Sequence, residues 1–197
     1  MDRQETNTVA RERVLEAAER LFAQRGYTGV TLRDIAAEVG IRHASLYHHV
    51  PGGKEELFVE VTERMLMRHR EGLRQAIRDA GPAIGDGLRA IAAWLLSQPP
   101  MDLIRMTYTD MPAIEPAHAE RLSNMAYQAL LIPVQEVLER AQERGEIGHH
   151  DLGLVAGGLV GMIESLHSVP EYALVTNRPA MANELIDVVL NGLRRRE

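Results

Sequence analysis

Apolar residues recur along most of the chain with the spacing of a helix, and no alternating or β-branched run predicts a strand. In the first long segment they fall at i, i+3, i+4, i+7 and i+8. These positions are Val14, Ala17, Ala18, Leu21 and Phe22. The stripe predicts a helix over residues 9–24 that ends at Gly26, because glycine readily adopts the left-handed conformation of a helix end. The predicted fold class is all-α.

Two short helices are expected next, with a glycine between them. Thr31 stands at the N-cap position of the first, residues 32–39, and Asp34 would complete a shortened capping box. Gly40 ends this helix. The second is expected over residues 42–50, and Pro51 ends it because proline disfavours helical geometry in the residue before it. Two short helices joined by a glycine-centred turn form the helix-turn-helix pattern.

A long helix is expected from Lys54 onward. Its inward-facing positions would be Leu57, Phe58, Val61, Met65, Leu66, His69 and Leu73. From Gly81 onward, glycines and prolines divide the chain into about five more helices, for a total of about nine. Their expected spans are residues 83–98, 101–109, 117–144, 151–168 and 180–195. Pro133 predicts a kink in the third of these, and Arg194–Arg196 would complement the dipole of the last one.

Composition narrows the class of protein. With 197 residues, 45% of them hydrophobic and 25% charged, the chain can bury a core and is not disordered overall. The absence of cysteine excludes disulfides, thiolate zinc sites, iron–sulfur clusters and cysteine nucleophiles. The polar residues after Met1 do not resemble a leader, and no apolar stretch approaches about 18 residues. A cytoplasmic protein without a membrane partner is therefore expected.

The net charge of the chain and the local charge around the second short helix point to different partners. A net charge of −6 argues against nucleic acid, because Lys and Arg supply most affinity for phosphates. However, no acidic residue occurs between Val39 and Lys54. The helix over residues 42–50 is too short to be stable alone, so Ile41, Leu46 and Val50 should pack inward. The face left free would carry Arg42, His43, Ala44, Ser45, Tyr47, His48 and His49.

This free face fits a DNA-reading role, because the major groove admits one α-helix. Phosphate contacts from neighbouring segments would hold the helix in register. Thr31 and Arg33 at one helix start, and Gly52, Gly53 and Lys54 at the next, offer hydroxyl, backbone N–H and cationic donors. The same helix pair also occurs in bundles that never contact DNA, and the histidines could be solvent-facing bystanders.

Four blocks of residues resemble the signature of the TetR family of transcriptional regulators. They are Thr31-Leu32-Arg33-Asp34-Ile35-Ala36, Val39-Gly40-Ile41, Ala44-Ser45-Leu46-Tyr47-His48-His49-Val50 and Lys54-Glu55-Glu56-Leu57. The resemblance implies a homodimeric regulator, usually a repressor, that binds a palindromic DNA operator and is released by a small apolar or amphipathic molecule. It also implies a helix-turn-helix domain over residues 1–53 and a ligand-binding and dimerisation domain over residues 54–197.

The resemblance assigns roles residue by residue. Positions matching Tyr47, His49 and Lys54 generally meet the DNA backbone in this family, and positions matching His43, Ala44, Ser45 and His48 lie nearest the bases. Three features depart from the family pattern. Arg42 replaces the usual Ser or Thr cap and cannot accept the capping hydrogen bond. Val50 replaces an aromatic residue, and the turn at residues 51–53 is one residue longer than usual.

The C-terminal part offers a candidate dimer interface and a candidate ligand pocket. The helix over residues 151–168 is apolar on nearly every side, and its glycines permit close backbone approach. Core packing alone would explain this, but a two-fold interface is favoured. Its residues would be Leu152, Val155, Gly158, Leu159, Met162, Leu185 and Val189. A pocket, or else an ordinary core, would contain Trp94, Met101, Met106, Tyr108, Met111, Met125 and Tyr127.

The alternative class is a metal-dependent helical bundle or enzyme. Glu115 with His118 and Glu164 with His167 both have the Glu-x-x-His spacing of di-iron bundles. Chance predicts about one such pair at this composition, and Pro116 should place the first at a helix start or in a loop. His149 and His150 lack further ligands at metal spacing, so Asp151 is expected to be a helix cap. We expect no cofactor, no catalytic residues and no enzymatic activity.

Overall fold

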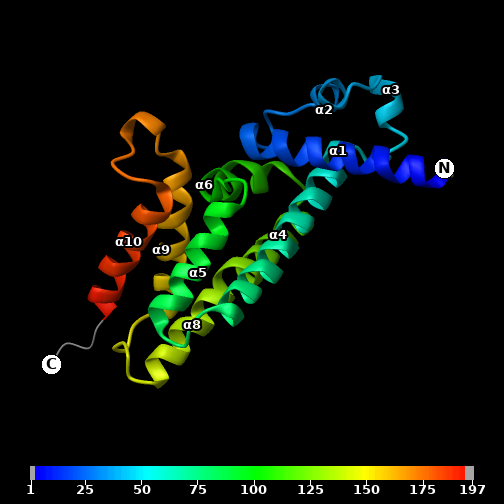
Figure 1. Cartoon of the computed structure of the whole chain (residues 1–197). Coiled ribbons are helices and arrows are strands. Elements are labelled where there is room, and N and C mark those ends of the chain that lie inside the picture. Colours follow the sequence, from blue (N-terminus) through cyan, green and yellow to red (C-terminus); the bar gives the residue numbers. More distant parts are fainter. Residues whose placement is uncertain (1–2, 194–197) are drawn as a thin grey trace. The chain divides into compact units, whose positions relative to one another are not determined.

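A computed structural model describes the backbone of residues 3–193 and the side chains of residues 8–193. All regular elements in that range are helices, so the predicted all-α class is confirmed (Figure 1). The described residues form two compact units. Unit 1 contains the chain up to Met65 together with Asp102–Asn124, and unit 2 contains Leu66–Met101 together with the chain from Met125 onward.

Unit 1 begins with three helices that match the expected order. They are α1 (Arg3–Arg25), α2 (Leu32–Val39) and α3 (His43–Leu46). Gly26 and Gly40 have φ values of 71° and 77°, which confirms both as left-handed helix ends. The helix expected over residues 42–50 is shorter than predicted. Residues 47–49 form a turn, although the Val50 N–H still donates to the Leu46 carbonyl at 3.0 Å.

Unit 1 is completed by the first part of α4 (Gly53–Asp79), by α6 (Leu103–Arg105) and by most of α7 (Pro116–Ala126). Phe22 of α1 meets Phe58 of α4 edge to face, with ring centroids 5.1 Å apart. Ile35 and Leu46, from α2 and α3, are buried in the same hydrophobic cluster. The two short helices are therefore held by packing against longer ones, as their length requires.

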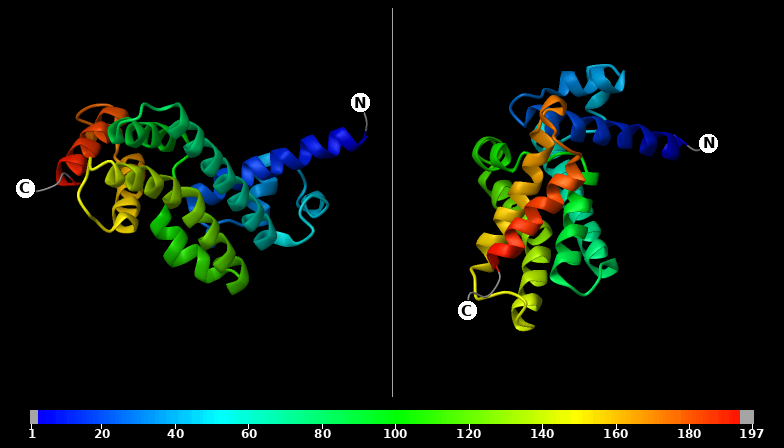
Figure 2. Two further views of the ribbon diagram at one scale, coloured as in Figure 1. Left: turned by 90° about the horizontal axis from the view of Figure 1, so that it is seen from below. Right: turned by 60° about the vertical axis from the view of Figure 1, so that its left-hand side comes forward.

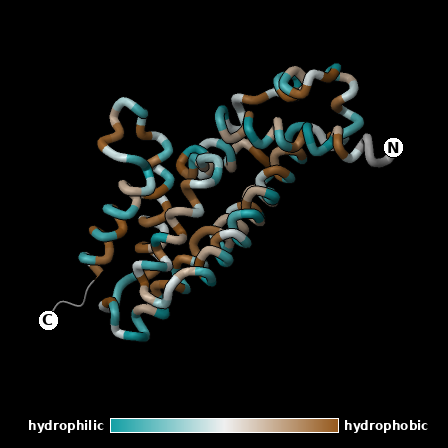
Figure 3. Tube along the Cα trace, viewed as in Figure 1, coloured by the Kyte–Doolittle hydropathy of each residue, from teal (hydrophilic) through white to brown (hydrophobic). Residues whose placement is uncertain are grey.

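Unit 2 contains the second part of α4 with α5 (Ile84–Ser97), α8 (Ile132–Glu143), α9 (Leu152–Ser165) and α10 (Arg178–Leu193). Helix α10 packs beside α5 and α9 (Figure 2). Along the helices, brown and teal positions alternate in Figure 3, which is the amphipathic pattern expected of helices around a core. Fully buried side chains in this unit include Leu73, Leu88, Ile91, Leu95, Leu138 and Leu159.

π-helical turns occur in two of the predicted helical spans, in each case shortly before a proline. The span 117–144 is divided into α7, a π-helical turn over Tyr127–Leu131, and α8. The π turn ends where the Ile132 N–H donates to the Tyr127 carbonyl, directly before Pro133, which has no N–H to continue the ladder. The span 101–109 is likewise replaced by α6 and a π turn over Met106–Asp110, just before Pro112.

Two predictions, the end of the last helix and the boundary between the functional domains, are not tested by the described residues. The last two residues of the helix predicted over 180–195, and the charge at Arg194–Arg196, lie outside the described residues. The predicted domain boundary after residue 53 coincides with the start of α4, whereas the compact units divide α4 after Met65. The functional domains remain a prediction. No helix in the described range is long and apolar enough to cross a bilayer.

Candidate nucleic-acid interface

The start of α2 is fixed by the predicted capping box. The Thr31 hydroxyl accepts the Asp34 N–H at 3.2 Å, and Asp34 Oδ2 accepts the Thr31 N–H at 2.8 Å. Hydrogen bonds from the Thr31 side chain and backbone lower the pKa of Asp34, so its carboxylate stays charged in this reciprocal arrangement. Arg33 is exposed beside the cap. The helix start therefore presents a cation and further backbone N–H groups on a fixed frame.

The α3 segment separates a buried side from an exposed one. Leu46 and Val50 are buried, and Ile41 is half-buried against the same core. Tyr47 is 49% exposed, and the ring of His43 meets it edge-on at 5.2 Å. The remaining predicted DNA-contact positions of α3 are exposed or half-buried. They are Arg42, Ala44, Ser45, His48 and His49.

Two details at α3 bear on how the segment can meet a partner. Arg42 occupies the N-cap position without a side-chain cap bond, as expected from its lack of an acceptor. Nδ1 of His49 is buried and has no hydrogen-bond partner among the described atoms. A polar ring atom in that state is available to a ligand or a water molecule.

Lys54 has an internal partner. Its ammonium donates to the Tyr27 carbonyl at 3.0 Å and lies 4.0 Å above the Tyr27 ring. An ammonium has three N–H donors, so this bond leaves capacity for a phosphate. Gly53, at the first position of α4, has a φ of 77°, which a side chain would disfavour. Lys54 is thus positioned at the helix start rather than extended into solvent.

The α3 segment itself carries no acidic side chain, which favours an anionic partner. The nearest acidic residue before the acid-free stretch, Glu38, pairs with Arg20 at 3.2 Å. Backbone N–H groups at helix starts such as those of α2 and α4 can bind phosphate oxygens, although the first turns of these helices also carry Asp34 and Glu55 with Glu56. An exposed recognition helix flanked by two such starts defines the class of helix-turn-helix DNA-binding regulators. Residues 14–61 match the family model described as "Bacterial regulatory proteins, tetR family".

Comparison with whole proteins identifies the family. The chain is 30% identical over 148 residues to the transcriptional repressor AcnR of Corynebacterium diphtheriae, covering 72% of this chain and 68% of AcnR. The chain belongs to the TetR family of transcriptional regulators. It is also 43% identical over 86 residues to the regulator LmrA of Bacillus subtilis, a match that covers only 44% of each protein. These relatives are named as regulators, not enzymes.

The fold is similar to that of solved structures along most of the chain. AibR, in complex with isovaleryl coenzyme A and operator DNA, superimposes with a TM-score of 0.74. The alignment covers 91% of this chain and 97% of AibR at 19% identity. At that identity the match establishes the fold alone.

The predicted ligand-binding residues are divided between the two units. Trp94, Met101, Met125 and Tyr127 belong to unit 2, and Met106, Tyr108 and Met111 belong to unit 1. Met111 is part of the hydrophobic core of unit 1, Met106 packs against that core, and Tyr108 is 78% exposed. In unit 2, Met101 is buried, Trp94 is half-buried and Tyr127 is exposed.

The sequence did not predict a group of buried, unpaired polar atoms in unit 2, although Trp94 was among the expected ligand-binding residues. Buried atoms without a hydrogen-bond partner occur on four side chains there, namely His69, Trp94, Glu164 and His167. His69 was predicted only as an inward-facing position, and the last two only as a possible metal pair. A histidine and a glutamate on otherwise apolar helix faces were the available signal, because such residues are rarely buried without a partner.

These polar side chains belong to the C-terminal half of α5 or contact it or the segment directly after it. The rings of His69 and Trp94 meet at 6.5 Å, and Glu164 accepts the Met101 N–H at 3.0 Å. Burial lowers the pKa of His69 to about 4 and raises that of Glu164 to about 7. Burial also lowers the pKa of His167, against the effect of a hydrogen bond with the Leu95 backbone. Neutral forms of all three are therefore favoured.

The predicted interface residues share helices α9 and α10 in unit 2. Leu152, Val155, Leu185 and Val189 are half-buried, and Gly158 and Met162 are exposed. Leu159 differs, because it is fully buried in the core of its own chain. Leu154 and Val188, which were not predicted, are 75% and 65% exposed. A side chain added at Gly158 or Gly161 would meet no atom within 4 Å.

The two Glu-x-x-His pairs have different surroundings. Glu115 directly precedes α7, as Pro116 led us to expect, and it lies with His118 close to Glu55 of α4. Within the described residues, these three are the only group with metal-ligand spacing. Asp151 caps α9 as predicted, because its side chain accepts the Leu154 N–H at 3.0 Å.

Proposed function

We propose that this regulator is a homodimeric repressor that binds a palindromic operator and is released by a small apolar or amphipathic molecule. The observation that carries the proposal is the exposed, acid-free face of α3 between two helix starts that can bind phosphate. The base-reading positions would be His43, Ala44, Ser45 and His48. The backbone-binding positions would be Thr31, Arg33, Arg42, Tyr47, His49 and Lys54.

The exposed apolar surface of α9 and α10 supports a dimer. Leu154, Met162 and Val188 are large apolar side chains exposed on these helices. The open space above Gly158 and Gly161 would let the backbone of a second chain approach closely. Because a two-fold dimer presents two α3 segments, it would fit an operator whose half-sites are related by the same symmetry.

The unpaired polar atoms of unit 2 support a ligand site. An apolar surrounding with a few convergent polar groups is typical of small-molecule pockets. His69, Trp94 and Glu164 would bond the polar end of an amphipathic molecule, and Met101 would contact its apolar part. AibR, which shares the fold, is described in complex with isovaleryl coenzyme A. We place the helix-turn-helix domain at residues 1–53 and the ligand-binding and dimerisation domain at residues 54–197.

Release would be a shift between two populations. A ligand that bound the DNA-free form more tightly than the DNA-bound form would lower operator affinity by the ratio of the two affinities. Helix α4 is continuous from Gly53 to Asp79, so it connects the ligand-binding segment to Lys54. By reciprocity, operator DNA would weaken ligand binding by the same factor.

Replacing Tyr47 by Ala tests the DNA surface. The probe is duplex DNA enriched from a random pool by the wild-type protein. Loss of one phosphate contact should weaken binding about tenfold, with similar effects on different sequences. Fluorescence anisotropy at fixed salt measures this effect. Tyr172→Ala is the matched control, because Tyr172 is 92% exposed and lies in unit 2. Equal affinity of Tyr47→Ala and wild type would contradict the assignment.

Replacing Gly158 by Arg tests the dimer. The site is open within its own chain, so the helix should tolerate the substitution, while a close helix–helix interface should not. Sedimentation velocity should show a dimer for the wild type and a shift toward monomer for the variant. Ser123→Arg, at an exposed position of α7 outside the proposed interface, is the control. A monomeric wild type at high concentration would refute the dimer.

A further inference from the structure

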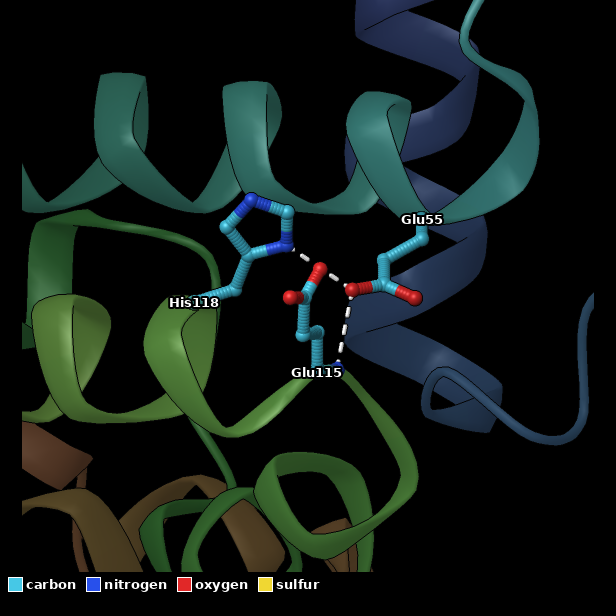
Figure 4. Close-up of side chains that lie close together, drawn as sticks. All are labelled: Glu55, Glu115 and His118. Carbon is cyan, nitrogen blue, oxygen red and sulfur yellow. Dashed lines mark hydrogen bonds and ion pairs between the residues drawn. The ribbon is translucent and has the colours of Figure 1, made fainter.

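Glu55, Glu115 and His118 bring two carboxylates and an imidazole together in unit 1 (Figure 4). One ligand atom of each residue lies within 4.8 Å of the others. Glu55 is in the first turn of α4, Glu115 directly precedes α7, and His118 is in the first turn of α7. Residues about sixty positions apart therefore meet at two helix starts.

Among the described residues, hydrogen bonds involve Glu55, the Glu115 backbone and His118, but not the carboxylate of Glu115. Oε1 of Glu55 accepts the Glu115 N–H at 2.9 Å and lies 2.8 Å from Nδ1 of His118. The Glu115 backbone bond, followed by that of His118, lowers the pKa of Glu55, so its carboxylate is ionised. The carboxylate of Glu115 has no hydrogen-bond or ion-pair partner in the described part of the chain, yet it points toward the same place (Figure 4).

We propose that these three residues bind a divalent transition-metal ion, with Zn²⁺ as the preferred ion. Zinc takes imidazole nitrogen and carboxylate oxygen at about 2.1 Å, which places neighbouring ligand atoms about 3.4 Å apart. Small side-chain rotations reach that spacing from the observed one. The imidazole favours a transition metal over Mg²⁺ or Ca²⁺, which prefer oxygen ligands. Two carboxylates balance the charge of the ion, and water would complete its coordination.

A metal ion at this position would affect the structure around the start of α4. Glu55 directly follows Lys54, a proposed phosphate contact, so a bound ion would fix the first turn of α4 against the start of α7. Helix starts that bind phosphate depend on their backbone N–H groups being held in place. Metal loading would therefore strengthen the frame that carries Lys54.

Metal titration of the chelator-treated, full-length protein tests the site without DNA, so its outcome is independent of the proposed repressor function. Calorimetry with Zn²⁺ should show saturable binding of one ion per chain in the micromolar range, and Co²⁺ should give the visible absorption of low-coordinate cobalt. Glu115→Gln should weaken binding by at least about tenfold, since second-shell changes alone reach that size. His118→Ala should do the same.

The choice of variants separates a metal site from a structural contact. Glu115→Gln keeps the backbone N–H that bonds Glu55, so it removes a ligand without removing the contact between α4 and α7. Glu120→Gln, an exposed position of α7, should bind Zn²⁺ as the wild type does. Absence of saturable binding, or unchanged binding in Glu115→Gln and His118→Ala, overturns the proposal. Binding abolished instead by His149→Ala places the ion elsewhere and overturns it too.

Discussion

Among the described residues, buried polar atoms without a hydrogen bond are fewer in unit 1, where they are Nδ1 of His49 and Nε of Arg105, than in unit 2, where they lie on four side chains. Asp110 is buried there, and its carboxylate accepts the Tyr27 N–H at 2.8 Å and lies 3.5 Å from Nε of Arg105. Arg105 also donates to the carbonyls of Phe22 and Ala23, at 3.2 and 2.7 Å. These are backbone groups at the end of α1, where carbonyls have no helical partner.

In unit 2, polar atoms are buried without such partners. His69 has both ring nitrogens unpaired, and Glu164 uses only one of its oxygens. Each unsatisfied group costs about 1–3 kcal/mol, so this unit carries a free-energy cost that unit 1 largely avoids. A ligand that bonded these atoms would offset part of the cost, and this would couple its binding to stability. The contrast indicates a fixed geometry in unit 1 and is consistent with the ligand site that we propose in unit 2.

The largest expected effect comes from removing a paired group in unit 1. Asp110→Ala leaves the Tyr27 N–H without its acceptor and Arg105 without its buried ion-pair partner, and should lower the free energy of unfolding by about 3 kcal/mol. Urea denaturation measures the loss. Asp187→Ala is the control, because its ion pair with Arg89 is solvent-exposed and should contribute less than about 1 kcal/mol. Equal losses in the two variants would remove the distinction drawn for unit 1.

A smaller effect on stability should come from Glu164 in unit 2, and it should depend on pH. Burial raises the pKa of Glu164 to about 7 from an ordinary value of 4.5, so the folded state binds more protons between these values. Stability should therefore fall as pH rises through this window, by about 2 kcal/mol. Glu164→Gln should lack this part of the fall while keeping an acceptor for the Met101 N–H. Identical pH profiles for the variant and the wild type would show that Glu164 is not buried as described.

The smallest effect should be a gain in stability. His69→Phe removes two unpaired nitrogens at similar volume, and should raise the free energy of unfolding by about 1 kcal/mol near neutral pH. Because burial lowers the pKa of His69 to about 4, wild-type stability should fall as pH drops from 6.5 toward 4, and the variant should lose this dependence. His149→Phe, at an exposed position, is the control. A loss of stability in His69→Phe would mean that the ring is satisfied by bound water.

Local features of unit 1 could be predicted well. The bounds of α2, the helix ends at Gly26 and Gly40, and the capping box of Thr31 with Asp34 all match the structure. Each depends on residues within about four positions of one another, so the sequence contains all that is needed. The π turns before Pro112 and Pro133 were not predicted, because the missing N–H could equally have produced a kink or a break.

Contacts between distant segments could not be predicted. Asp110 meets Tyr27 across 83 positions, and Glu55 meets His118 across 63. The Glu-x-x-His spacing drew attention to Glu115 and His118, but no periodicity indicates that Glu55 completes the group. The same limit applied to the ligand residues. Their composition suggested one pocket, and the sequence did not show that four of them belong to unit 2 and three to unit 1.

The sequence by itself determined the helical class, the helix-turn-helix and its family, because helix periodicity, capping and short motifs are interactions between near neighbours. The tertiary structure alone decided which polar groups are paired. Burial, and therefore the cost of an unmet hydrogen bond, depends on which distant segments cover a side chain. That is why the unpaired atoms of His69 and Glu164, and the meeting of Glu55 with Glu115 and His118, emerge only from the folded chain.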